Sequence, residues 1–172
     1  CRGRIAADDE ATRLGLPEVK LGILPGWGGT FRLPRLIGTQ AALALMMPGR
    51  ELSAREARRR GLVAEVAPPE AFLDGARAWA GDLARRGDAR LKARRAATRG
   101  AAARWLVDAN PLGRRVVCAL ARRSAARSGP AYPAPRRIAD VVAGGGGRTA
   151  ALTREADALG DLLTGPVARN LL

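Results

Sequence analysis

The sequence predicts one α/β domain in which helices predominate, and three observations support this prediction. The chain has 172 residues, 47% of them hydrophobic, which is enough for one compact core and too few for two full domains. Short segments with strand character occur only within residues 1–66. The longer segments that follow carry apolar residues at helical spacing.

The first third of the chain begins with two predicted strands, over residues 4–7 and 12–16, separated by the turn DDEA. Four glycines and a proline over residues 22–29 indicate a loop. Residues 30–38 then have the spacing of a short helix, which Pro34 shortens or kinks.

The middle of the chain alternates helices with one strand. Thr39 is expected to cap a helix that ends at the PG pair of residues 48–49. Ser53 and Glu56 have the spacing of a capping box, in which each side chain bonds the other residue's backbone N–H. Residues 62–66 alternate as a strand. The helix that follows is expected to bury one face, formed by Phe72, Ala76, Trp79 and Leu83.

Beyond Gly87 the composition becomes polar and basic, so we place a boundary between parts 1–87 and 88–172. Asn110 has the place of an N-cap before the next helix, followed by proline at the first helical position. The apolar stripe of that helix is expected to consist of Leu112, Val116, Ala119 and Leu120.

The last part of the chain begins with PAYPAP, which must run extended because the residue before each proline avoids the helical region. Pro135 opens a predicted helix, and the four glycines of residues 144–147 end it. A final helix is expected over residues 149–163. Its apolar side is expected to carry Leu152, Ala156 and Leu159.

The formal net charge of +14 is typical of nucleic-acid binders, but two features argue against this class. Only Lys20 and Lys92 are lysines among 30 cationic residues, so the charge is arginine beside an excess of Ala, Gly and Pro. Aromatic residues make up only 3% of the chain, which leaves almost no platforms for base stacking. We therefore expect no nucleic-acid partner, and a basic nucleic-acid binder stays a third hypothesis, which a steep salt dependence of binding would reveal.

The cysteines are only Cys1 and Cys118, which do not form a disulfide framework or a zinc motif. We expect a reducing, cytoplasmic location and no metal. No run of about 18 apolar residues is present, so no transmembrane segment is expected. The chain begins without Met, with a strand-like segment almost at once, and we expect it to be a fragment of a longer polypeptide.

Residues 1 to about 86 resemble the second half of a crotonase domain, the enoyl-CoA hydratase and isomerase family. The segments GLPEVKLGILPGWGGTFRLPRLIG and PGRELSAREARRRGLVAEVAPPE carry this resemblance. The later segments NPLGRRVV, YPAP and PVARNLL resemble the connector of multifunctional fatty-acid oxidation enzymes, in which a 3-hydroxyacyl-CoA dehydrogenase part follows. The resemblance implies the C-terminal half of a crotonase-like ββα fold followed by a helical connector.

The resemblance implies a catalytic role for Glu18. In the family two glutamates share the proton and water chemistry of adding water to a 2-enoyl-CoA. The glutamate of the PE segment corresponds to Glu18, which would donate a proton to the α-carbon of the thioester. Leu16, Val19 and Ile23 would give it apolar surroundings. Without the motif, Glu18 would be taken for a solvated glutamate at the end of a strand.

The substrate-binding residues that the resemblance implies are Pro17, Pro25, Gly26, Trp27 and Gly28. Residues 25–28 would form a wall of the acyl pocket, although glycines there also suit an ordinary turn. Trp27 has two interpretations, contact with the acyl chain or packing in the core. A dinucleotide loop is a poor alternative, because GWGGTF lacks the third glycine at the required spacing.

The resemblance also indicates what the chain lacks. The family's oxyanion donors and its other glutamate precede the position of Cys1, so we expect this chain alone to be inactive. The substrate would be an acyl-CoA, with no cofactor in this chain, and NAD would bind only the absent dehydrogenase part. Association with a thiolase or self-association is also implied. An isomerase, which needs only one glutamate, and a non-catalytic interaction module with an exposed apolar stripe on its helices remain alternatives.

Overall fold

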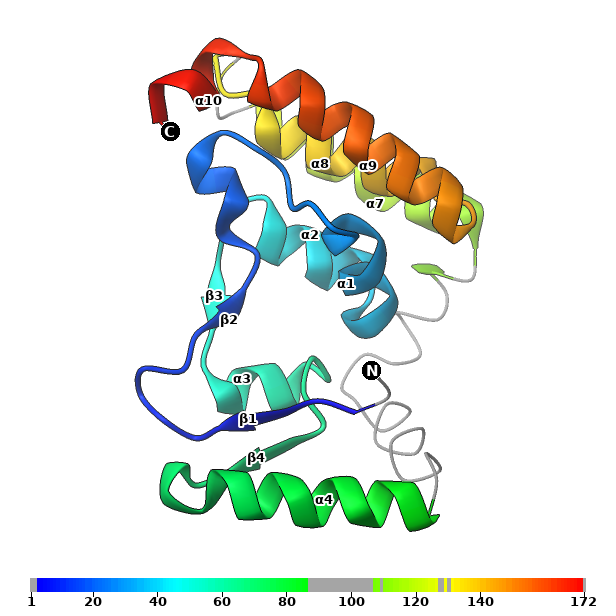
Figure 1. The fold of residues 1–172 in the computed structure, drawn as a ribbon. Coiled ribbons are helices and arrows are strands. Elements are labelled where there is room, and N and C mark those ends of the chain that lie inside the picture. The colour runs from blue at the N-terminus through cyan, green and yellow to red at the C-terminus, as the bar shows by residue number, and fades with distance from the viewer. Residues whose placement is uncertain (1–2, 87–106, 109, 127–128, 130, 172) are drawn as a thin grey trace. The chain divides into compact units, whose positions relative to one another are not determined.

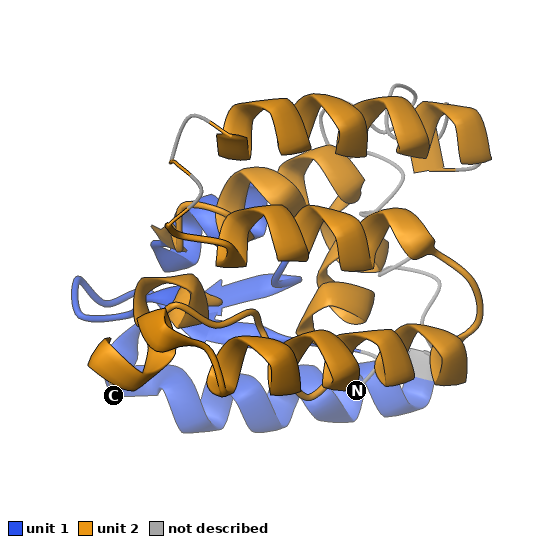
Figure 2. Cartoon of the chain, turned by 90° about the horizontal axis from the view of Figure 1, so that it is seen from above, with its two compact units in different colours: residues 1–14, 52–101 blue, residues 15–51, 102–172 orange. Residues whose placement is uncertain are grey.

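A computed structural model describes residues 3–86, 107–108, 110–126, 129 and 131–171 (Figure 1). The chain divides into two compact units, coloured separately in Figure 2, and each is made of two separate stretches of sequence. Unit 1 comprises residues 1–14 and 52–101, and unit 2 comprises residues 15–51 and 102–172. The predicted boundary at residue 87 lies outside the described residues.

Unit 1 is built on a pair of parallel strands, β1 (Ile5–Ala7) and β4 (Glu65–Ala67). Ile5 lies opposite Glu65 in the register. Parallel strands require a crossover connection, and the helix α3 (Ala54–Arg59) lies in it. The helix α4 (Phe72–Arg86) follows the single turn η2 (Pro69–Ala71) and contacts both strands.

In the part of unit 2 that the structure describes, the short turn η1 (Pro17–Leu21) is accompanied by the helices whose bounds follow. These are α1 (Gly29–Ile37), α2 (Thr39–Met46), α7 (Pro111–Ala125), α8 (Ala134–Gly144), α9 (Arg148–Leu163) and α10 (Pro166–Leu171). The short strands β2 (Leu14–Gly15) and β3 (Glu51–Leu52) pair with each other. Gly15 and Glu51 belong to unit 2, and Leu14 and Leu52 belong to unit 1.

The helices of unit 2 form two layers, with α7, α8 and α9 over α1 and α2 (Figure 1). The helix α8 contacts α7, α9, α1 and α2 and therefore lies at the centre. The largest fully buried side chains of unit 2 are Leu24, Pro25, Leu45, Met46, Cys118 and Ile138. These residues come from both layers, so the core lies between them.

Several predicted local features are confirmed. Ser53 and Glu56 form the capping box at the start of α3, and Asn110 caps α7 through its side chain, which accepts from the N–H of Leu112. Proline lies inside α1 as expected, and in the run of four glycines Gly144 ends α8 while residues 145–147 separate it from α9. The apolar residues predicted to form one face of α4 are half-buried.

Other predictions need correction. The strand predicted over residues 12–16 is reduced to two residues, because Pro17 lacks the N–H that would continue the ladder and begins a 3₁₀ turn instead. The strand predicted over residues 62–66 lies at Glu65–Ala67. Thr39 is the first residue of α2 and Gly38 is its N-cap. The N–H of Thr39 donates to the side chain of Asp108 at 3.1 Å.

The buried faces of α7 and α9 also differ from the prediction. On α7, Leu112, Val116 and Leu120 are exposed, because the face that packs on α8 carries the smaller residues Cys118 and Ala125. On α9 the buried face consists of Ala151, Glu155, Ala158 and Leu162. The spacing of apolar residues did not predict this face, because it includes the charged residue Glu155.

Candidate active site

Glu18 lies in a tight turn at the start of unit 2. Pro17 is the first residue of η1, where its fixed φ suits the turn and its missing N–H costs nothing. Gly22 ends the turn with a φ of 75°, and its N–H donates to the carbonyl of Val19 at 2.9 Å. A left-handed conformation at this point favours glycine. The sequence PEVKLG therefore fixes the backbone on both sides of Glu18.

The carboxylate of Glu18 contains a buried oxygen without a partner. The residue is half-buried, beside the buried Val19 and the half-buried Leu16 and Ile23. Its Oε2 atom is inaccessible to solvent and accepts no hydrogen bond from the described residues. Buried carboxylate oxygens are nearly always hydrogen-bonded in native proteins, because an unpaired one has lost its hydration. The Oε2 atom therefore keeps its full capacity to accept or carry a proton.

Tyr132, which precedes α8, holds the turn that carries Glu18. Its hydroxyl donates to the carbonyl of Val19 and accepts from the N–H of Gly22 at 3.1 Å. The two bonded residues lie one and four positions after Glu18. Tyr132 therefore fixes the part of the backbone from which the Glu18 side chain extends.

The predicted pocket wall, residues 25–28, lies in the loop between η1 and α1. Pro25 is fully buried, and the carbonyl of Gly26 accepts from the N–H of Gly29 at 3.0 Å. Trp27 has a positive φ of 48°, which is uncommon for a residue with a side chain. Gly28 is buried with a φ of 85° and is the N-cap of α1.

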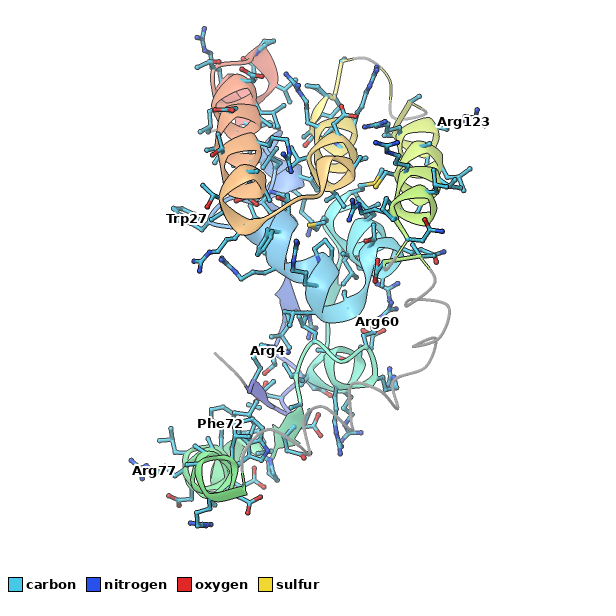
Figure 3. The ribbon with its side chains drawn as sticks, turned by 90° about the vertical axis from the view of Figure 1, so that its right-hand side faces the viewer. Arg4, Trp27, Arg60, Phe72, Arg77 and Arg123 are labelled. Carbon is cyan, nitrogen blue, oxygen red and sulfur yellow. The ribbon has the colours of Figure 1, made fainter. Side chains whose placement is uncertain are left out.

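The side chain of Trp27 is 94% exposed, and Figure 3 shows it on the outer side of its loop. Packing of Trp27 in the core is therefore wrong. An exposed indole still presents a large apolar surface beside the loop, so its contact with an acyl chain stays a prediction.

Glu155 of α9 anchors the same loop from the other side. Its Oε2 accepts from the backbone N–H of Thr30 at 2.9 Å and from the Thr30 hydroxyl, and its Oε1 accepts from the N–H of Gly28. Glu155 is only 3% exposed. The first turn of α1 carries no acidic residue, so this carboxylate from a distant helix satisfies its free N–H groups and its positive dipole.

The predicted site residues thus lie on one continuous stretch, residues 17–28, which Tyr132 and Glu155 anchor. Sequence reasoning missed both anchors. The tyrosine of YPAP was interpreted only as extended chain, and the one available signal for Glu155 was an acidic residue at helical spacing from Ala151, Ala158 and Leu162.

No group of three or more potential metal-ligating side chains occurs among the residues that the structure describes. Within the same residues, no helix combines the length and apolar character that crossing a membrane requires.

The fold and the site define a class. The chain has a crotonase-like fold, α/β and predominantly helical, and the family model described as enoyl-CoA hydratase/isomerase matches residues 2–131. The match covers well over half of the chain. The chain therefore belongs to the enoyl-CoA hydratase/isomerase family.

Solved structures are similar in fold. EchA1_1 from Mycobacterium paratuberculosis matches with a TM-score of 0.55 and 24% identity, over 97% of this chain and 49% of its own length. A carnitinyl-CoA hydratase from Mycobacterium avium matches with a TM-score of 0.54 and 23% identity, over 97% of this chain and 48% of its own. This chain spans about half the length of each of these structures.

Proposed function

We propose that this chain supplies the proton-transferring carboxylate of a 2-enoyl-CoA hydratase, with Glu18 as the catalytic residue. The observation that carries the proposal is the buried, unpartnered Oε2 of Glu18, in a turn fixed by Pro17, Gly22 and Tyr132. Membership of the enoyl-CoA hydratase/isomerase family supports a CoA thioester as substrate.

The proposed reaction adds the elements of water across a double bond conjugated with the thioester. The water oxygen bonds to the β-carbon and gives one of its protons to a second base, the other glutamate that the family resemblance implies. The π electrons move toward the thioester oxygen, and the α-carbon then takes a proton from the carboxyl group of Glu18, which regains a proton through solvent as the second base releases its own. Protonation at the α-carbon converts the enolate into the 3-hydroxyacyl thioester. In the reverse direction the Glu18 carboxylate removes the same proton.

The substrates would come from fatty-acid β-oxidation in the cytoplasm. The 3-hydroxyacyl product would pass to an NAD-dependent 3-hydroxyacyl-CoA dehydrogenase part of the same polypeptide. Residues 25–28 would border the acyl chain.

The test compares Glu18→Gln with wild type in the native protein that contains this chain. Hydration of a short 2-enoyl-CoA and exchange of the α-proton in deuterated water are both measured. We expect each rate to fall about a thousandfold, because the amide cannot transfer a proton, while the unfolding midpoint stays unchanged. Glu70→Gln, at an exposed glutamate, is the control. Normal turnover of Glu18→Gln would remove Glu18 from the mechanism.

Isomerisation of a 3-enoyl to a 2-enoyl thioester uses the same carboxylate as a proton shuttle between two carbons. Analysis of the products from 2-enoyl and 3-enoyl substrates separates the two reactions. A 3-hydroxyacyl product supports hydration, and a shifted double bond without added water supports isomerisation.

The exposed apolar stripe of α7 favours a second candidate function, self-association. Leu112, Val116 and Leu120 are 66%, 58% and 58% exposed at intervals of four residues, so they lie along one side of the helix. The stripe joins an apolar groove, because Leu120 also lines a pocket with Leu43 of α2 and with Met47, which directly follows that helix. Sedimentation of wild type and Val116→Asp tests it. A wild-type dimer that Val116→Asp dissociates supports self-association through α7, and a monomeric wild type excludes self-association. Binding of a thiolase would be the other form of association.

A further inference from the structure

Three arginines from three helices of unit 2 meet at one loop, residues 144–147 between α8 and α9. Nη2 of Arg35, on α1, donates to the carbonyl of Gly146 at 3.0 Å. The guanidinium of Arg154, on α9, donates to the carbonyl of Gly145. The guanidinium of Arg114, on α7, lies against Gly145 so closely that a Cβ there would collide with it. Arg35, which is 111 positions from Gly146, thus joins two other cations at one loop.

The glycines of this loop make room for the arginines. A Cβ on Gly144 would collide with the guanidinium of Arg154, as one on Gly145 would with that of Arg114. Gly145 and Gly146 also have positive φ values, 54° and 83°, which favour glycine. The run of glycines that interrupts the helical pattern therefore gives close access to the loop backbone.

The charge of this cluster is not neutralised by carboxylates. Among the described residues, no ion pair joins a carboxylate to Arg35, Arg114 or Arg154. On α9, which carries Arg154, Glu155 accepts from Gly28 and Thr30, Asp161 pairs with Arg137, and Asp157 is exposed. On the neighbouring α8, Asp140 pairs with Arg122. Burial and the nearby charge of Arg114 lower the pKa of Arg35.

Two donors of the cluster are buried without an acceptor, the Nε atoms of Arg114 and Arg154. Buried guanidinium donors without partners are costly, and a bound anion is one of the groups that satisfies them. The start of α9 adds further donors. Its N-cap, Gly147, provides no side-chain cap, and its first turn carries no acidic residue, so free backbone N–H groups follow the same loop.

We infer that Arg35, Arg114 and Arg154, together with the start of α9, bind a phosphate group. Arginine suits phosphate because its planar guanidinium donates two parallel hydrogen bonds to it. If the proposed function holds, this phosphate group belongs to the coenzyme A moiety of the substrate. Arg35 follows Gly28 by seven residues on α1, about 10 Å along the helix axis, so the cluster lies on the same helix that the 25–28 loop opens.

The test measures binding to this chain by calorimetry at about 0.15 M salt, where unspecific attraction between exposed charges is screened. The probes are coenzyme A, dephospho-coenzyme A, which lacks the 3′-phosphate, and inorganic phosphate. The variant is Arg114→Gln/Arg154→Gln. The matched control, Arg123→Gln/Arg136→Gln, removes two charges at exposed positions on α7 and α8; Figure 3 shows Arg123 on the outer face of α7.

We expect coenzyme A to bind about a hundredfold more weakly to Arg114→Gln/Arg154→Gln, about tenfold for each guanidinium, and nearly unchanged to the control. If wild type binds dephospho-coenzyme A more weakly than coenzyme A, the cluster contacts the 3′-phosphate. If wild type binds both equally, the cluster contacts the diphosphate. If inorganic phosphate shows the same dependence and coenzyme A binds no more tightly, the phosphate site stands and its coenzyme A source is wrong. No binding by wild type, or an equal loss in the control, overturns the inference.

These outcomes are independent of the test of the proposed function. Glu18→Gln should bind coenzyme A as wild type does. If Glu18→Gln keeps full hydratase activity while the arginine variant loses coenzyme A affinity, the catalytic proposal fails and the phosphate site stands. If Glu18→Gln is inactive and the arginine variant binds normally, the reverse holds.

Discussion

The hydroxyl of Tyr132 lies 3.1 Å from the backbone nitrogen of Gly22, and the same hydroxyl donates to the carbonyl of Val19. One side-chain oxygen thus bonds two backbone groups of the turn that carries Glu18. The contact is made by a single atom, so it is removed by a substitution that keeps the ring.

Tyr132→Phe should lower kcat for 2-enoyl-CoA hydration about tenfold and leave KM nearly unchanged, because the turn loses its anchor while the acyl-binding surface stays. The expected loss in free energy of unfolding is about 1 kcal/mol, since the N–H of Gly22 keeps its bond to Val19. Steady-state kinetics and urea unfolding of the native protein measure both. A loss of stability with unchanged kcat would show that Tyr132 has only a structural role.

Glu155→Gln should destabilise unit 2 by about 1–3 kcal/mol, because an amide has only one acceptor oxygen for the donors of Gly28 and Thr30. Asp157→Asn, an exposed position on the same helix, is the control and should change the free energy of unfolding by less than about 0.5 kcal/mol. Urea unfolding followed by circular dichroism checks this prediction. Equal effects of the two substitutions would contradict it.

Trp27→Ala should change stability by less than about 0.5 kcal/mol, since the side chain is 94% exposed and packs against no core. If the indole borders the acyl chain, kcat/KM should fall more for long than for short 2-enoyl-CoA substrates. Leu73→Ala, at another exposed apolar residue, is the control. Equal losses for all chain lengths would remove Trp27 from the acyl-binding residues.

Cys118 should make the stability depend on pH in the alkaline range. Burial raises the pKa of its thiol, so the folded protein holds the proton more tightly than the unfolded chain does. This contribution is complete below the unfolded pKa of about 8.5 and is lost as the pH rises toward the folded value. Urea midpoints from pH 7 to pH 10 should therefore fall more for wild type than for Cys118→Ala. Parallel curves would refute the assignment.

Local signals in the sequence predicted much of this fold. The capping box of Ser53 and Glu56, the N-cap Asn110 and the proline inside α1 depend on residues a few positions apart, and such patterns are readable without a structure. These elements were predicted with nearly correct boundaries, whereas the 3₁₀ turn that begins at Pro17 was not predicted.

The rest depended on contacts that a sequence does not display. The residues that Tyr132 and Glu155 bond are 110 to 127 positions away, so neither anchor is recognisable from its neighbours. The face of α7 that packs on α8 consists of small residues, and the more hydrophobic residues of the helix are exposed. Hydrophobicity predicted which helices exist but failed to predict which side of α7 is covered.

The distant anchors also set an order for folding during synthesis. The turn that carries Glu18 and the 25–28 loop leave the ribosome more than 100 residues before Tyr132 and Glu155, whose side chains bond them. Closing such long loops is slow, because the entropy of bringing the ends together is lost before any contact forms. The nascent chain therefore holds the turn of Glu18 without its anchor until Tyr132 has emerged, and the loop of residues 25–28 without its anchor until Glu155 has emerged.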